Sequence, residues 1–250
     1  MALSPSEPDS PRPVDRQFVT THWSVILTAG EGTSPAAQVA MEQLCRAYWY
    51  PLYAYVRRKG YDVHDAQDLT QEFFARLLAR NYLSVADRNK GKFRSFLLGS
   101  LEHFLAREWT KAHAQKRGGG RSNLSLDELE AENRYLLEPA HDLTARKMFD
   151  QRWAITVLDQ AMAQLRQECI SNNKGELLSK VECLLSGEKG EAPYAQIAAE
   201  LNTGEGAIKM AVLRLRRRYG ELIRAQIAQT VTTPEDAQEE LQFLFRTLRD

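Results

Sequence analysis

The stretch Pro193-Tyr194-Ala195-Gln196-Ile197-Ala198-Ala199-Glu200-Leu201-Asn202-Thr203-Gly204-Glu205-Gly206-Ala207-Ile208-Lys209 runs on to Leu213-Arg214-Leu215-Arg216-Arg217-Arg218-Tyr219. Its apolar residues repeat at helical spacing on both sides of a break, which predicts two helices joined by a tight turn. Pro193 suits the first position of a helix, and Asn202 and Gly204 tolerate unusual backbone angles at the turn. The pattern is that of a helix-turn-helix whose second helix could enter a DNA major groove. An ordinary helical hairpin with a solvated basic face has the same pattern.

The composition is that of a globular protein outside the membrane. The 250 residues suffice for one large domain or two small ones, and 43% are hydrophobic and 26% charged. No apolar run approaches the length of a membrane span, and residues 1–16 contain no signal-peptide core, so we expect a cytoplasmic protein without membrane insertion. Cys45, Cys169 and Cys183 are far apart without zinc-ligand spacing, which indicates reduced thiols.

The net charge of zero conceals a segregation of charge along the chain. Residues 92–121 hold seven Lys/Arg against two Glu, and residues 205–224 hold six against two. Residues 122–142 hold six Asp/Glu against one Arg, and residues 231–250 hold five against two. Two basic segments are therefore separated and followed by acidic ones. Such a chain can bind phosphate backbones locally while it stays neutral overall.

Helical patterns fill most of the remaining chain. Asp62 is a cap for a helix over residues 63–80, and a second helix over residues 93–116 carries an apolar stripe that includes Trp109. Pro51 is expected to kink or divide the helix that starts at Ala36. Further capped helices start at Thr144 and at Thr233-Pro234.

No alternating apolar and polar run typical of strands is present, so we expect an all-α protein. Two helical bundles joined by a flexible linker are predicted, the C-terminal one containing the helix-turn-helix. The predicted parts are an N-terminal extension (1–34), a first domain (35–118), an acidic linker with one short helix (119–147), a second domain (148–229) and a final amphipathic helix (230–250). That last helix is expected to pack on the bundle.

Three segments, in this order, resemble the sigma factors of bacterial RNA polymerase. Residues 65–77, Asp-Ala-Gln-Asp-Leu-Thr-Gln-Glu-Phe-Phe-Ala-Arg-Leu, look like the polymerase-binding helix of that family. Residues 93–98, Phe-Arg-Ser-Phe-Leu-Leu, and the basic helix after them resemble the segment that binds the minus-ten promoter element. The terminal helix-turn-helix resembles the domain that reads the minus-thirty-five element. With only these two domains, over roughly residues 35–118 and 150–226, the chain is most similar to the extracytoplasmic-function group.

The resemblance implies core RNA polymerase and promoter DNA as partners, with no catalysis, metal or cofactor in the protein itself. An anti-sigma or other regulatory protein is a partner that the group commonly has. The implied polymerase contacts are Asp65, Asp68, Gln71 and Glu72. The implied minus-ten contacts are Arg94, Ser95, His103, Arg107, Lys111, Lys116 and Arg117. The minus-thirty-five candidates are Glu205, Lys209, Met210, Leu213, Arg214 and Arg217; Met210 and Leu213 could equally be packing residues.

The chain departs from the family pattern in places, and other interpretations remain open. Gly99 and Ser100 stand where primary sigma factors have two tryptophans, and Gly204 replaces the usual serine cap. The acidic helix face could be an ordinary solvated surface. His64 and Asp68, four residues apart, could with His103 serve a helical metal-dependent enzyme. A DNA-binding regulator that works without polymerase is the remaining alternative.

Overall fold

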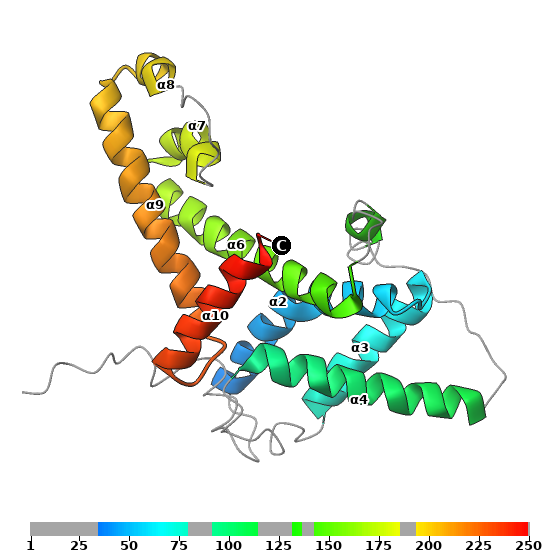
Figure 1. Ribbon diagram of the computed structural model, residues 1–250. Coiled ribbons are helices and arrows are strands. Elements are labelled where there is room, and N and C mark those ends of the chain that lie inside the picture. The colour runs from blue at the N-terminus through cyan, green and yellow to red at the C-terminus, as the bar shows by residue number, and fades with distance from the viewer. Residues whose placement is uncertain (1–34, 80–91, 115–131, 137–142, 186–193, 250) are drawn as a thin grey trace, which may run out of the picture.

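The computed structural model describes residues 35–79, 92–114, 132–136, 143–185 and 194–249 (Figure 1). Within these ranges the regular elements are helices, so the all-α prediction is confirmed. The labelled helices are α2 (Pro35–Arg58), α3 (Val63–Ala79), α4 (Phe93–Ala114), α6 (Ala145–Ser171), α7 (Gly175–Leu185), α8 (Tyr194–Glu200), α9 (Glu205–Ala228) and α10 (Pro234–Thr247). The predicted N-terminal extension and most of the predicted linker lie outside the described residues.

The second half of α2 is the most deeply buried part of the N-terminal segment. Tyr48, Leu52, Tyr53 and Val56 are each at most 1% exposed. The helix runs unbroken through Pro51, so the expected division at this proline is wrong. Proline removes one backbone hydrogen bond, and the buried side chains on both sides of it hold the two halves of the helix in place.

The helix α3 follows its predicted pattern. The carboxylate of Asp62 accepts a hydrogen bond from the backbone N–H of Asp65 at 2.8 Å, which confirms the predicted cap. Ala66, Phe73 and Leu77 point into the core. Asp68, Gln71 and Glu72 are exposed on the outer face of the helix. Gln67 and Thr70 are also polar but are buried with the core residues.

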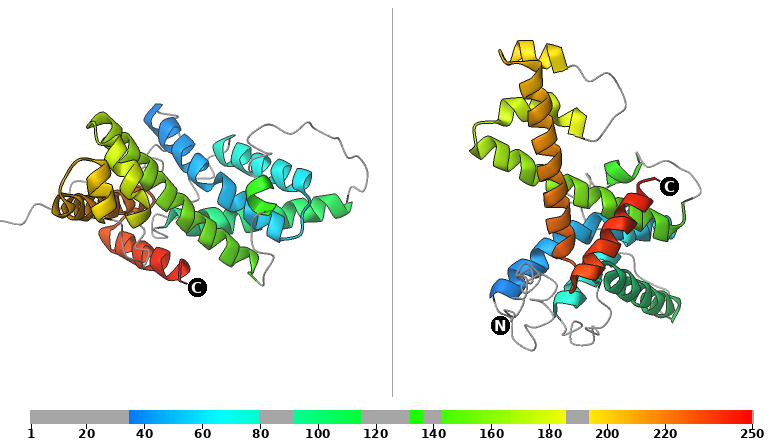
Figure 2. Two further views of the ribbon diagram at one scale, coloured as in Figure 1. Left: turned by 90° about the horizontal axis from the view of Figure 1, so that it is seen from above. Right: turned by 60° about the vertical axis from the view of Figure 1, so that its left-hand side comes forward.

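The long helix α6 joins the two ends of the molecule. Thr144 caps it as predicted, because its side chain accepts a hydrogen bond from the N–H of Lys147. At 1.5 Å per residue its length is about 40 Å. Its first half packs on α2, with Phe149 close to Tyr48, and its second half packs on α9 (Figures 1 and 2).

The predicted division into two bundles joined by a flexible linker is not confirmed. The buried residues form one hydrophobic cluster that continues from Tyr48 in α2 to Leu244 in α10. Phe93 of α4 stacks edge-on against Tyr48, with ring centroids 5.1 Å apart, so α4 also belongs to this cluster. In this structure the N-terminal and C-terminal helices therefore share a core.

The C-terminal helices are connected by tight turns. Asn173 and Asn202 have positive φ angles of 55° and 52°, in the left-handed region that asparagine tolerates. The prediction for Asn202 is therefore confirmed, whereas Gly204 has an ordinary extended conformation with φ −86°. The helix α10 begins at Thr233-Pro234 as predicted, since the Thr233 side chain accepts a hydrogen bond from the N–H of Asp236. It packs on α9 and α6.

None of the helices in the described ranges combines the length and the apolar character that crossing a membrane requires.

Residues 132–136, within the predicted linker, form a short helix that docks on α2. The carboxylate of Glu132 accepts hydrogen bonds from Arg57 Nη2 at 2.8 Å and Nε at 3.0 Å, and from the hydroxyl of Tyr53. Burial alone would raise the pKa of Glu132, but these hydrogen bonds outweigh burial and lower it. The ionised carboxylate is therefore stabilised in the folded protein.

We predict that Glu132→Gln lowers the free energy of unfolding at pH 7 by about 1–3 kcal/mol, because Arg57 and Tyr53 lose a charged partner. The folded-state pKa lies below the ordinary value of 4.5, so this stabilisation is complete above that value and is lost as the pH falls through the folded-state pKa. Urea unfolding at several pH values measures this difference in the free energy of unfolding. The free energies of the wild type and of Glu132→Gln should become equal in acid. Asp159→Asn on exposed α6 surface is the control, and equal stability at pH 7 would contradict the prediction.

Candidate nucleic-acid interface

The predicted polymerase contacts lie together on the outer face of α3. Asp65, Asp68, Gln71 and Glu72 are all exposed. Burial raises the pKa of Asp65, and the nearby carboxylates of Asp62 and Asp68 raise it further. This face is therefore a concentrated patch of negative charge and hydrogen-bond acceptors on a rigid helix.

Part of this acidic face is already engaged with α4. Glu72 forms an ion pair with Arg76, and Arg76 also reaches Glu108 at 2.7 Å. The guanidinium lies 4.9 Å from the ring centroid of Phe104. Asp68, in contrast, makes no ion pair within the described part of the chain. Asp65 makes no ion pair there either, but burial and neighbouring carboxylates raise its pKa, so Asp68 is the acidic residue whose charge is most available to a partner.

Three of the predicted minus-ten residues form an exposed row along α4. His103, Arg107 and Lys111 follow one another at four-residue intervals, which places them on one face of the helix, and all are exposed. Lys111 pairs with Glu108 at 2.9 Å but keeps 61% of its side chain exposed. Ser95 is exposed at the start of the same helix. Lys116 and Arg117 lie outside the described residues.

The placement of Arg94 contradicts its predicted role as a DNA contact. Its side chain is 13% exposed and forms ion pairs with Asp150 of α6 at 2.5 Å and with Glu240 of α10 at 3.2 Å. The guanidinium also lies over the rings of Phe243 and Trp153, 4.1 and 5.0 Å from their centroids. A phosphate cannot reach a cation that is enclosed by two carboxylates and two rings.

Trp109 was assigned to the apolar stripe of α4, but 58% of its surface is exposed. It lines a hollow of about 280 Å³ together with Tyr55, Lys59, Tyr61 and Glu102, among others. An exposed indole offers a stacking surface for an unpaired base. Arg107 and Lys111, two positions before and after Trp109, lie on a different side of the helix. Sequence reasoning missed it because helical spacing alone places Trp109 with the core residues; its position between basic residues was the available signal.

All six minus-thirty-five candidates are exposed on α9, opposite the buried residues Ile208 and Val212. Met210 and Leu213 are 49% and 59% exposed, so the alternative that they are packing residues does not hold within the described structure. Lys209 pairs with Glu205 at 2.6 Å, and Arg217 with Glu221 at 3.3 Å.

The arginine cluster of α9 divides into exposed and structural members. Arg216 donates to the backbone oxygen of Leu184 at the end of α7. Arg218 donates to both oxygens of Glu168 on α6, at 2.7 and 2.8 Å. Arg214 makes no such contact with the described residues and faces solvent. Arg216 and Arg218 therefore position α9, whereas Arg214 and Arg217 face outward.

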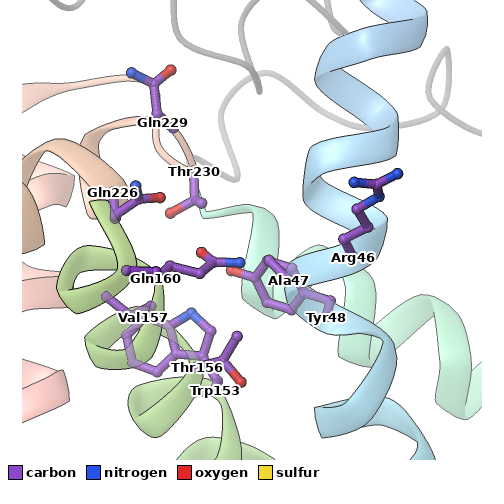
Figure 3. A pocket seen from close by; sticks show the side chains of 11 residues that line it. Arg46, Ala47, Tyr48, Trp153, Thr156, Val157, Gln160, Gln226, Gln229 and Thr230 are labelled. Atoms are coloured by element: carbon purple, nitrogen blue, oxygen red, sulfur yellow. The ribbon is translucent and has the colours of Figure 1, made fainter. Parts of the chain in front are cut away.

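A cavity of about 360 Å³ lies between α2, α6 and the end of α9 (Figure 3). The hydroxyl of Tyr48 and the indole nitrogen of Trp153 are buried here without a hydrogen-bond partner among the described groups. Burial raises the pKa of Tyr48, so its hydroxyl stays protonated. Among the described residues, its polar lining consists of Arg46, Tyr48, Trp153, three glutamines and two threonines.

The possible metal pair of His64 and Asp68 lies on the exposed face of α3. Within the described ranges, no group of three or more histidine, cysteine, aspartate or glutamate side chains could hold a metal ion.

Comparisons of the sequence with protein-family models and with curated proteins, and of the fold with solved structures, give no significant match.

We predict that Arg214→Ala and Arg217→Ala each weaken binding to duplex DNA and lower the salt dependence of the binding constant. Each lost phosphate contact should reduce the slope of log K against log[salt] by about 0.9. Fluorescence anisotropy at several salt concentrations measures this. Arg166→Ala removes an exposed arginine of α6 that pairs with Glu182 of α7. This variant is the control and should leave the slope unchanged. Equal slopes in all variants would show that α9 does not contact DNA.

Proposed function

We propose that this protein is a sigma factor of the extracytoplasmic-function type, which binds core RNA polymerase and directs it to promoters. The observation that carries the proposal is the exposure of three functional faces in one chain. An acidic face on α3 and basic faces on α4 and α9 are all open to partners, in the order that the sequence resemblance implies. No reaction is assigned to the protein, since nucleotide chemistry belongs to the polymerase.

In this proposal, α3 binds the polymerase. Asp68 and Gln71 provide oriented acceptor and donor groups on a rigid helix, a geometry suited to charge-assisted hydrogen bonds with a basic or polar partner surface. Because Glu72 is shared with Arg76, it contributes to the interface only if that ion pair rearranges. Asp68 is thus the residue expected to contribute most.

The helix α4 holds the minus-ten region. Arg107 and Lys111 contact the phosphate backbone, and His103 lies on the same exposed face. Trp109 adds a surface on which a base of the opened strand can stack. The helix α9 reads the minus-thirty-five region through Arg214, Arg217 and their exposed neighbours.

A DNA-binding regulator without polymerase is the second candidate, and the exposed basic face of α9 would suffice for it. The two candidates differ in the role of α3. For such a regulator the acidic face is ordinary solvated surface, and its charge can be changed without loss of function.

We predict that Asp68→Arg combined with Glu72→Arg weakens binding to core RNA polymerase by about tenfold or more, because two acceptors become like charges to the partner surface. A pull-down and a titration with purified core enzyme measure the effect. Asp159→Arg, a charge reversal on exposed α6 surface, should bind as the wild type does. Wild-type affinity in the double variant would contradict the interface, and no binding by the wild type would favour the regulator.

A further inference from the structure

The cavity between α2, α6 and the end of α9 has a deep end that is polar (Figure 3). Tyr48 and Trp153 are 1% and 2% exposed, and neither the hydroxyl nor the indole N–H has a hydrogen-bond partner within the described part of the chain. Figure 3 shows the hydroxyl of Tyr48 pointing away from α2 into the cavity. Buried polar groups in folded proteins are nearly always hydrogen-bonded, so two such groups at one cavity need a partner.

The outer end of the cavity reaches the surface. Arg46 and Ala163, which belong to the lining, are exposed to solvent, so a small molecule can enter there. Further in, Ala47, Val157 and the ring of Trp153 form apolar walls. The volume of about 360 Å³ lies in the range of small-molecule sites, which are mostly apolar with a few polar groups and often lie between helices.

A single ordered water does not account for this cavity. A water occupies about 30 Å³ in the liquid, so the cavity has about twelve times the volume of one water. One water could bridge Tyr48 and Trp153, but further waters would lie partly against Ala47 and Val157, which offer no hydrogen bond. A molecule with a polar group at one end and an apolar body satisfies both parts of the cavity.

The deep end favours an uncharged hydrogen-bond acceptor. The indole of Trp153 can only donate, and burial raises the pKa of Tyr48, so its hydroxyl keeps its proton. The lining residues that the structure describes include no carboxylate, and Arg46 extends away from Tyr48 (Figure 3). Arg94, 5.0 Å from the ring centroid of Trp153, is already paired with two carboxylates. A charged group at the deep end would therefore be buried without an opposite charge, which is unfavourable.

We propose that this cavity binds a small uncharged molecule, which places a carbonyl or similar acceptor against Tyr48 and Trp153 and a flat apolar body between α2 and α6. The amide of Gln160 also lines the cavity and can donate to or accept from a second polar group of the ligand. The site is independent of the proposed function, because none of its lining residues is a candidate contact for polymerase or DNA. A ligand that binds only the folded protein also stabilises it.

The test uses NMR of the ¹⁵N-labelled full-length protein with benzamide as the probe. The indole N–H signal of Trp153 is assigned by its loss in Trp153→Phe. Benzamide should shift this signal and leave those of Trp49 and Trp109, which do not line the cavity, in place. Toluene lacks the acceptor, and benzylamine and benzoate are charged, so each should bind at least about fivefold more weakly than benzamide.

Two tyrosine variants test the role of the buried hydroxyl. Tyr48→Phe should raise the dissociation constant of benzamide about three- to tenfold, because one hydrogen bond to the probe is lost. Its unfolding temperature without ligand should equal or exceed that of the wild type, because no hydrogen bond within the protein is lost. Tyr219→Phe is the matched control: this hydroxyl donates to the carbonyl of Leu158 at 3.1 Å and does not line the cavity. That variant should unfold at a lower temperature and bind benzamide as the wild type does.

The contrary results are distinct. If benzamide leaves the Trp153 signal in place and Tyr48→Phe unfolds at a lower temperature, water alone satisfies the hydroxyl and the inference is wrong. Equal affinity for benzamide in the wild type and in Tyr48→Phe would show that the hydroxyl does not hold the probe. Toluene or a charged relative that binds as tightly as benzamide would overturn the assigned ligand chemistry. None of these results bears on binding to polymerase or promoter, so the proposed function is tested separately.

Discussion

The packing of α6 against both α2 and α9 is the interaction on which the rest of this structure depends. Phe149 and Trp153, in the first half of α6, belong to the aromatic cluster around Tyr48 and Phe93. In its second half, Glu168 anchors α9 through Arg218. Because one helix serves both ends, the candidate faces on α3, α4 and α9 are parts of a single framework. A change in how α6 packs would move all three relative to one another.

Local features could be predicted well from the sequence, because each depends on residues that are neighbours along the chain. The caps at Asp62, Thr144 and Thr233 follow from short side chains placed before helical patterns. The left-handed turn at Asn202 has the same local origin. Helical periodicity also placed Glu205, Lys209, Arg214 and Arg217 on the exposed face of α9, whereas it left Met210 and Leu213 open between the exposed face and the packed one.

Long-range pairings could not be predicted, because periodicity contains no information about which distant segment covers a helix face. Arg94 was assigned to DNA, although residues 56 and 146 positions away enclose it. Trp109 shows the converse: its spacing matches the core stripe, but 58% of its surface is exposed. The expected two-bundle arrangement depends in the same way on packing between distant helices. The same holds for the acidic C-terminal segment. Its Glu239 and Glu240 pair with Lys92 and Arg94 at the start of α4, and the composition of the segment does not reveal this contact.

In the proposed function, each exposed face makes a contact that is useful only in a complex of protein, polymerase and promoter. The protein would then give core RNA polymerase the ability to start at specific sites. In vitro transcription with purified core enzyme on a genomic DNA library, followed by mapping of the 5′ ends, tests this most directly. We expect defined start sites that appear only when the protein is added. Identical transcripts with and without the protein, despite measurable binding of the protein to DNA, would contradict it.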